Sequence, residues 1–153
     1  MFRNLLSRLF AETPDSGSLA SHDAEVAVAA LLVRIARADD RYSDEEKHRI
    51  EGVLARRRGL GPVEAAEERA AAEMIEAEAP DTVRFTRIIK ERVDVQDRQN
   101  VIAAMWEIAY ADGSRASEEE SMIRLIAGLL GVNDRDSALV RQRVLEGLGL
   151  QGQ

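Results

Sequence analysis

The 153-residue chain contains no cysteine, which excludes disulfide bonds, thiolate metal sites and a cysteine nucleophile. It has only two histidines, and their spacing supports no Ser-His-Asp grouping, so we expect no enzymatic activity. No run of about 18 apolar residues occurs, so we expect no transmembrane helix. The first ten residues lack the apolar core and the cleavage site of a signal peptide. We therefore expect a cytoplasmic protein, at most peripheral to the inner membrane.

Aromatic residues are also scarce, at 4% of the chain, whereas alanine, leucine, glutamate and arginine are abundant. This composition favours helix over sheet. The 28 acidic residues outnumber the 21 basic ones, which gives a net charge of −7. A chain this acidic is a poor candidate for binding nucleic-acid phosphates, and we expect no nucleic-acid partner. The charge suits cations or the basic surface of another protein instead.

A sixteen-residue segment occurs twice, 73 positions apart, as IARADDRYSDEEKHRI at Ile35–Ile50 and IAYADGSRASEEESMI at Ile108–Ile123. Seven positions are identical, and they are Ile35/Ile108, Ala36/Ala109, Ala38/Ala111, Asp39/Asp112, Glu45/Glu118, Glu46/Glu119 and Ile50/Ile123. The identical residues are of two kinds, apolar residues at helical spacing and an acidic turn. The repeat therefore predicts a duplicated helix–turn–helix unit, with any chemistry located in the acidic turn.

Apolar periodicity and capping signals predict seven main helices. Ser43 with Glu46, and Ser117 with Glu120, have capping-box spacing and mark two of the helix starts. The expected helices run from Ser21 or Asp23 to about Ala38, from Ser43 to about Gly59, from Pro62 to about Ala77, from Pro80-Asp81 to about residue 93, from Asp94 or Asp97 to Ala109, from Ser117 to Gly131, and from Asn133 or Asp134 through Leu145.

These helices form one all-α domain, which we place at residues 23–150. The first three correspond to the last three, so repeat one covers about 23–78, a connecting helix covers 81–93, and repeat two covers about 95–148. Each three-helix half is too small to bury its own apolar face, so we expect the halves to pack together as a bundle about a pseudo-twofold axis. Residues 1–22 are predicted to be a separate N-terminal segment and linker.

Each half carries an Asp at the end of one helix and a Glu at the start of the next: Asp39 with Glu46, and Asp112 with Glu119. The helix macrodipole favours an acid at a helix N-terminus and disfavours one at a C-terminus, so both Asp residues call for a compensating partner. The partner is either a divalent cation held by carboxylates and turn carbonyls, or the amides and side chains of a tight helix corner. The residues alone favour the corner, and the turns lack the spacing of an EF-hand loop.

IARADDRYSDEEKHRIEGVL and MWEIAYADGSRASEEESMIRLIAGLLGV resemble the two halves of the tellurite-resistance TerB family. The family signature is an apolar helix ending in Ala-Asp-Gly, a short polar turn, then Glu-Glu opening a second apolar helix. The resemblance covers about Asp23–Leu148. The second half carries the fuller motif, whereas the first has Asp40 where the glycine would stand. That residue would have to tolerate the left-handed conformation, which Asp does better than most residues.

The resemblance implies an all-helical fold without established catalysis, associated with tellurite and other chemical stress. Such domains are thought to be metal-linked or partner-binding modules, often near membranes. Asp39, Asp112, Glu46 and Glu119 match the acidic positions of the family. We therefore expect a non-enzymatic stress-response module that takes Ca²⁺, Mg²⁺, Mn²⁺ or Zn²⁺ at these residues. The alternative is a metal-independent scaffold that binds another protein.

The N-terminal segment Met1–Phe10 places Phe2, Leu5, Leu6 and Leu9 on one helical face, with Arg3 and Arg8 off it. A helix this short is unstable alone in water, so it needs a surface to lie on. The linker Glu12–Ser21 is long enough for the segment to lie on its own domain, on a second copy of the protein or on a membrane. Two arginines attract anionic lipid only weakly, so we favour protein contact, in cis or in a homo-oligomer.

Overall fold

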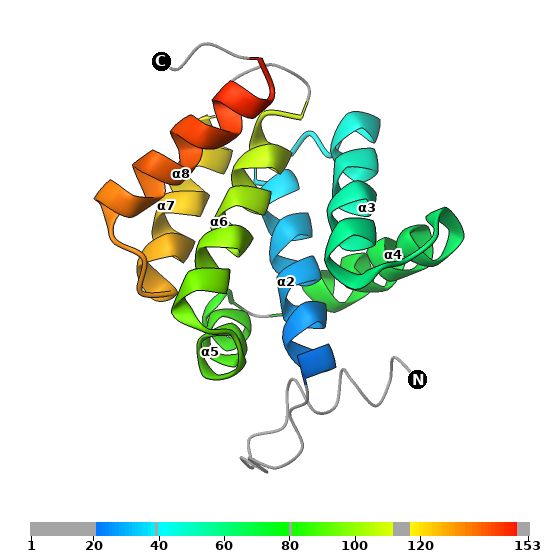
Figure 1. Ribbon diagram of the computed structural model, residues 1–153. Helices are drawn as coiled ribbons and strands as arrows, with labels where there is room; N and C mark the ends of the chain where they lie inside the picture. Colours follow the sequence, from blue (N-terminus) through cyan, green and yellow to red (C-terminus); the bar gives the residue numbers. More distant parts are fainter. Residues whose placement is uncertain (1–20, 39, 80, 112–116, 150–153) are drawn as a thin grey trace.

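The computed structural model describes residues 21–38, 40–79, 81–111 and 117–149, and these residues form seven helices and no strand (Figure 1). The helices are α2 (Ser21–Ala36), α3 (Asp44–Arg58), α4 (Pro62–Glu78), α5 (Val83–Arg92), α6 (Val95–Ala109), α7 (Ser117–Leu129) and α8 (Asp134–Gly147). The all-α class and the order of the helices are confirmed, with ends that differ from the expected ones by a few residues. Met1–Phe10 lies outside the described residues.

Local sequence signals account for most of the helix boundaries. Ser43 caps α3, Asp94 caps α6 by accepting a hydrogen bond from the Asp97 amide, and Pro62 occupies the first turn of α4. Two glycines, Gly59 after α3 and Gly131 after α7, have φ angles of 66° and 79°. This left-handed conformation is costly for residues with a Cβ atom, so glycine ends both helices at equivalent places in the two halves.

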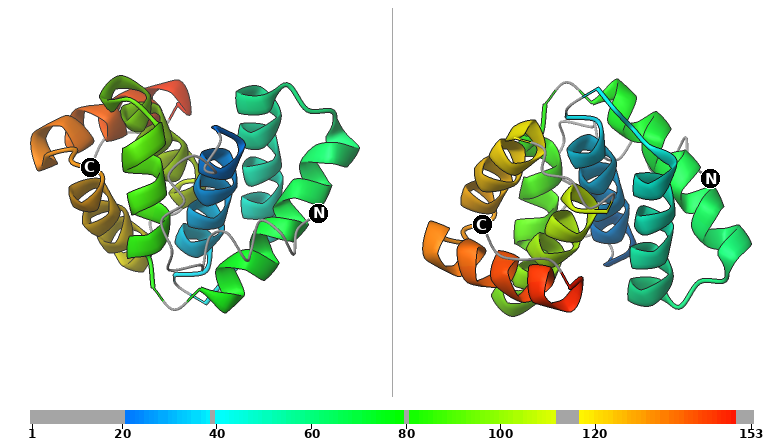
Figure 2. Two further views of the ribbon diagram at one scale, coloured as in Figure 1. Left: turned by 90° about the horizontal axis from the view of Figure 1, so that it is seen from below. Right: turned by 90° about the horizontal axis from the view of Figure 1, so that it is seen from above.

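The two halves pack with the same pattern of contacts. In the first half α2, α3 and α4 all touch one another, and α6, α7 and α8 do the same in the second. Between the halves α2 lies against α6, and the contact of α3 with α6 is matched by a contact of α2 with α7 (Figure 2). Exchanging the halves leaves this pattern unchanged, as the expected pseudo-twofold arrangement requires. The connecting helix α5 packs against α2, α6 and α7.

The core lies around α2 and α6, which are apolar on most of their surface. Leu31, Leu32 and Ile35 of α2 are completely buried, and Met105 and Trp106 of α6 are at most 1% exposed. A helix that is apolar on nearly all sides belongs at the centre of a bundle, and the other helices cover α2 in this way. Trp106 is therefore a core residue.

Ion pairs fix the C-terminal end of α2 against α4. Arg34 binds the Glu76 carboxylate at 3.0 Å and also donates to the backbone carbonyls of Glu76 and Ala79, at 3.2 Å each. Arg37 binds the other oxygen of the Glu76 carboxylate at 2.8 Å. Because carbonyls at the end of a helix have no partner within it, Arg34 acts as a cap for α4. The position of the turn that follows α2 is thereby determined by contacts to α4.

Candidate functional site

The helix ends that flank the two acidic turns lie at the same end of the molecule. Helices α2 and α6 pack side by side and run in the same direction, so both end where α3 and α7 begin (Figure 1). A hollow of about 440 Å³ lies between the first turn and α7, lined by Ala38 from the turn and by Glu118, Ser121, Met122 and Leu125 from α7. We call this region the acidic end, and its described carboxylates are Asp40, Asp44, Glu45, Glu46, Glu118, Glu119 and Glu120.

Asp40 adopts the left-handed conformation that its place in the motif predicted. Its φ angle is 63°, the sole positive value among the described residues other than glycine. Its amide donates to the carbonyl of Arg37 at 3.1 Å, which closes the turn after α2, and its side chain is exposed. Aspartate tolerates this conformation better than most residues because its short polar side chain can hydrogen-bond locally. The chain therefore turns here without glycine.

Glu46 is buried, with 4% of its surface exposed, and it closes a capping box at the start of α3. One of its carboxylate oxygens, Oε1, accepts from the Ser43 amide at 2.9 Å and from the Ser43 hydroxyl at 3.2 Å. The Ser43 hydroxyl in turn accepts from the Glu46 amide at 3.1 Å. These bonds satisfy amides that the first turn of a helix leaves without partners. The predicted box at Ser43 is confirmed, and Glu46 has a structural role in it.

The second half buries Glu119 and Glu120, at 1% and 6% exposure. The Tyr110 hydroxyl donates to Oε2 of Glu120 at 2.5 Å and accepts from Nε of Arg141 at 2.9 Å. Arg141 also lies over the stacked rings of Trp106 and Tyr110. Burial and the hydrogen bond to Glu120 raise the pKa of the Tyr110 phenol. The side chain of Ser117 is not among those described, so the second capping box stays a prediction.

A related cluster borders the first turn. The Tyr42 hydroxyl donates to Glu73 of α4 at 2.6 Å, and Arg69 binds Glu73 and also Glu51. The Tyr42 ring lies against two cations, with Arg37 at 5.3 Å and Lys47 at 5.0 Å from its centroid. Burial and the bond to Glu73 raise the pKa of the Tyr42 phenol.

Neither tyrosine cluster was predicted from the sequence, although one signal was present. The chain has only two tyrosines, and each of them borders an acidic turn. A tyrosine in an acidic turn can donate to a buried carboxylate, which then needs no cation at that oxygen. Arg69 and Arg141, which complete the clusters, come from α4 and α8, far from the turns in the sequence.

The four residues expected to bind a metal are only partly described. Asp39 and Asp112 lie outside the described residues, whereas Glu46 and Glu119 are both buried at the start of equivalent helices. Among the residues that the structure describes, no three acidic or histidine side chains are grouped closely enough to hold an ion. The donors at the acidic end are oxygens, which suit Ca²⁺, Mg²⁺ and Mn²⁺ better than Zn²⁺.

His48 is not part of the acidic site. Its side chain is 81% exposed, and its ring nitrogen lies 3.8 Å from Glu51. His48 is therefore a solvated residue on the surface of α3. The side chain of the other histidine, His22, is not among those described.

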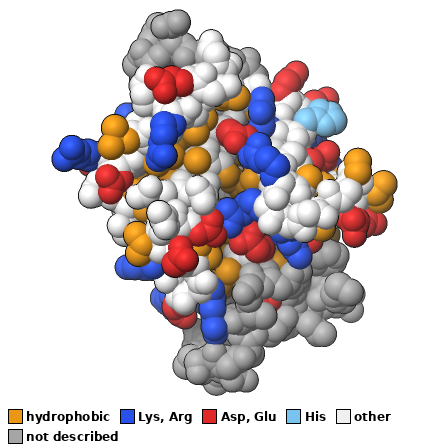
Figure 3. All heavy atoms as spheres, viewed as in Figure 1, with side chains coloured by type: hydrophobic (Ala, Val, Ile, Leu, Met, Phe, Trp, Pro, Cys, Tyr) orange, Lys and Arg blue, Asp and Glu red, His pale blue; other side chains and the backbone are white. Residues whose placement is uncertain are grey.

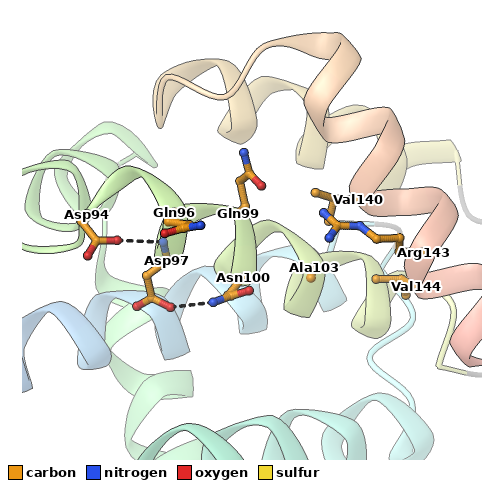
Figure 4. Close-up of a pocket in the computed structure, with 9 residues that line it drawn as sticks. All are labelled: Asp94, Gln96, Asp97, Gln99, Asn100, Ala103, Val140, Arg143 and Val144. Carbon is orange, nitrogen blue, oxygen red and sulfur yellow. Dashed lines mark hydrogen bonds between the residues drawn. The ribbon is translucent and has the colours of Figure 1, made fainter.

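A second concave surface follows the outward face of α6. Two hollows lie on its two sides, one of about 600 Å³ towards α8 (Figure 4) and one of about 610 Å³ towards α3. Both are lined by Asp97, Asn100 and Ala103. Arg57 spans the second hollow, with bonds of 2.8 and 2.9 Å to Glu25 and 3.3 Å to Asp97. Basic and acidic side chains alternate over this face (Figure 3). Because most of these charges are paired with one another, the surface carries no strong field of one sign.

Comparison with known proteins identifies the family. The model of the family described as tellurite resistance protein TerB matches residues 25–142. The matched range includes both acidic turns and five complete helices, α3 to α7, together with parts of α2 and α8. Neither the curated proteins nor the solved structures yield a match to this chain. No helix among the described residues is long and apolar enough to cross a lipid bilayer. The match covers well over half of the chain and agrees with the repeated motif and the helical fold, and the chain belongs to the TerB family.

Proposed function

We propose that this chain is a non-enzymatic stress-response module of the tellurite-resistance type that binds a divalent cation at its acidic end. The four side chains expected to take part are Asp39, Glu46, Asp112 and Glu119. The observation that supports the proposal is that α2 and α6 end, and α3 and α7 begin, at one end of the bundle, beside a hollow lined by Ala38 and Glu118. A single turn supplies few carboxylates, whereas two turns brought together supply enough oxygens for a hard cation.

The charges near the two turns support a cation. Asp40, Asp44, Glu45 and Glu118 are exposed and form no ion pair with any residue in the described part of the chain. Like charges gathered at one end of a molecule repel one another and raise the local concentration of counter-ions. A bound divalent ion would reduce this repulsion. Ca²⁺, Mg²⁺ or Mn²⁺ fits the oxygen donors, and Zn²⁺ is the least favoured of the four ions considered.

The alternative is a metal-independent scaffold in which the acidic turns are architectural and another protein is the ligand. Two observations favour it: the capping box that engages Glu46, and the bond from Tyr110 that engages Glu120. Both carboxylates already have hydrogen-bond donors within the protein. In this alternative the acidic end would attract a basic surface of the partner.

Isothermal titration calorimetry with Ca²⁺, Mg²⁺, Mn²⁺ and Zn²⁺ distinguishes the two proposals. For the cation site, we expect at least one ion to bind with a Kd below roughly 1 mM, the weak end of known calcium modules. That ion should also raise the melting temperature through mass action. Asp112→Ala should weaken binding. Glu91→Ala is the matched control, because it removes one exposed carboxylate from α5, away from the acidic end.

The outcomes separate the proposals clearly. If no ion binds or raises the melting temperature, and Asp112→Ala only lowers the stability of the fold, the turns are structural corners and the scaffold is favoured. If Asp112→Ala and Glu91→Ala weaken ion binding equally, the ion responds to net charge and has no defined site at the acidic end.

A further inference from the structure

The outer face of α4 carries an apolar stripe that no described residue covers. Val63, Ala66, Ala70, Met74 and Ala77 follow one another at intervals of three and four residues, so they lie on one side of the helix. Val63 and Met74 are 72% and 71% exposed, the two highest values among the large hydrophobic residues of the described part. Helix α4 lies at the edge of the bundle in both views of Figure 2, with this face outward.

The fold itself does not require this stripe, as the equivalent helix shows. The glycines Gly59 and Gly131 end the preceding helices and are 72 positions apart, which aligns α4 with α8. At the places of Val63, Ala70 and Met74, α8 carries Arg135, Gln142 and Glu146, and all three are exposed. Three of the five stripe positions are therefore polar in α8, whose own exposed apolar residue, Leu139, aligns with Glu67 beside the stripe. A surface that is apolar without a folding reason indicates a binding partner.

Unpaired acids border the stripe on one side. Glu67 and Glu78 are exposed and have no ion-pair partner among the residues described, whereas Glu68, Glu73 and Glu76 on the same helix are all paired with arginines. The occupant of this face should therefore be a short amphipathic segment with an apolar side and flanking positive charges. The small side chains of Ala66, Ala70 and Ala77 would allow it to approach the backbone of α4 closely.

We infer that the N-terminal segment Met1–Phe10 of the same chain packs on the outer face of α4. Its apolar residues Phe2, Leu5, Leu6 and Leu9 match the stripe, and Arg3 and Arg8 match the unpaired acids. The connection is long enough, because ten residues between Phe10 and Ser21 span up to about 33 Å when extended. Helix α2, which begins at Ser21, packs directly on α4. Tethering makes this contact intramolecular, so weak interactions suffice to hold it.

Paramagnetic relaxation in the full-length protein tests the inference. The chain has no cysteine, so Ser7→Cys, off the apolar side of the segment, gives a single site for a nitroxide label. We expect the label to broaden amide signals along α4. Replacing the stripe with its α8 counterparts, as Val63→Arg, Ala70→Gln and Met74→Glu together, should abolish the broadening. Leu139→Glu, on the exposed face of α8, is the matched control and should leave it unchanged.

A charge exchange provides a second measurement that leaves the apolar stripe intact. Arg3→Glu with Arg8→Glu should reduce the broadening of α4, and adding Glu67→Lys with Glu78→Lys should restore it. The inference is overturned if the label broadens no folded residue, or if the broadening centres on the hollow beside Leu125. It is also overturned if α4 broadens as strongly in a mixture of spin-labelled, unenriched molecules with unlabelled, isotope-enriched ones, because only a second copy can then be the occupant.

Discussion

The hydroxyl of Tyr110 donates a 2.5 Å hydrogen bond to the buried carboxylate of Glu120, ten residues later in the chain. The same hydroxyl accepts from Arg141 of α8 at 2.9 Å, so one phenol joins the end of α6, the start of α7 and the middle of α8. The carboxylate sits in the first turn of a helix, where the macrodipole also favours it. The hydrogen bond from Tyr110 therefore connects the end of α6 to the start of α7, and Oε2 of Glu120 needs no ion as a partner.

Tyr110→Phe should destabilise the protein. The substitution removes the donor to a buried carboxylate and leaves Arg141 without its acceptor on the ring, at a cost of about 1–3 kcal/mol in the free energy of unfolding. Urea unfolding followed by circular dichroism measures the change. Tyr42→Phe serves as the comparison, and we expect a smaller loss because Tyr42 is only partly buried. Equal losses at the two sites would contradict the importance of burial.

The two tyrosines should make the stability fall in alkaline solution. Their pKa values are raised in the folded state above the ordinary value of 10.0, so the folded protein holds the phenolic protons more tightly than the unfolded chain does. Their contribution is complete below about pH 10 and is lost as the pH rises above it. Melting temperatures measured from about pH 8 upward should show this decline. Replacing both tyrosines with phenylalanine should flatten the decline, and an unchanged slope would refute the assignment.

Two substitutions of Glu46 should separate its structural role in the capping box from a role in binding an ion. Glu46→Ala removes the bonds that the carboxylate accepts from Ser43 but keeps the backbone amide that donates to the Ser43 hydroxyl, so it should cost about 0.5–1.5 kcal/mol of stability. Glu46→Gln keeps a carbonyl oxygen that can accept from the Ser43 amide, so it should retain most of the stability while it loses the charge. Denaturant unfolding and calorimetry with the best-binding ion should be measured on both variants. If Glu46→Gln binds the ion as well as the original chain, Glu46 is not a ligand.

The turn at Asp40 should accept glycine, the residue that the family motif places there, better than it accepts alanine. Asp40→Gly removes the Cβ atom from a residue with a φ angle of 63°, and Asp40→Ala keeps it without the polar side chain. We expect the glycine variant to be more stable than the alanine variant by about 1 kcal/mol, because glycine adopts the left-handed conformation without steric cost. Thermal unfolding of the pair measures the difference. Equal stability would mean that the turn changes its conformation when the residue changes.

Deletion of residues 1–12 should lower the thermal stability of the protein or dissociate an oligomer, because the segment is expected to lie on protein. Differential scanning calorimetry and light scattering measure the two effects. Binding to vesicles of anionic lipid should be negligible with or without the segment, since two arginines contribute on the order of 1 kcal/mol each. Unchanged stability and mass, together with loss of vesicle binding, would show that the segment contacts a membrane instead.

The features that the sequence predicted correctly depend on interactions between residues close together in the chain. The capping box of Ser43 and Glu46, the glycine stop at Gly59 and the left-handed Asp40 each involve a few consecutive residues. Helix periodicity is local in the same way, so the seven helices could be located from their apolar spacing. The repeat then supplied the relation between the halves, because equal sequences fold into equal units.

The amino-acid sequence by itself thus determined the helices, their order, the family and the two acidic turns. Only the tertiary structure decided that α2 and α6 end on the same side of the bundle, that Tyr42 binds Glu73 and that Arg141 reaches Tyr110. The residues in these last two contacts are 31 positions apart. Such contacts depend on how α4 and α8 pack against the other helices. That packing is determined by the burial of apolar side chains throughout the domain. No local pattern encodes that packing, so the partners of the acidic residues became known only from the folded chain.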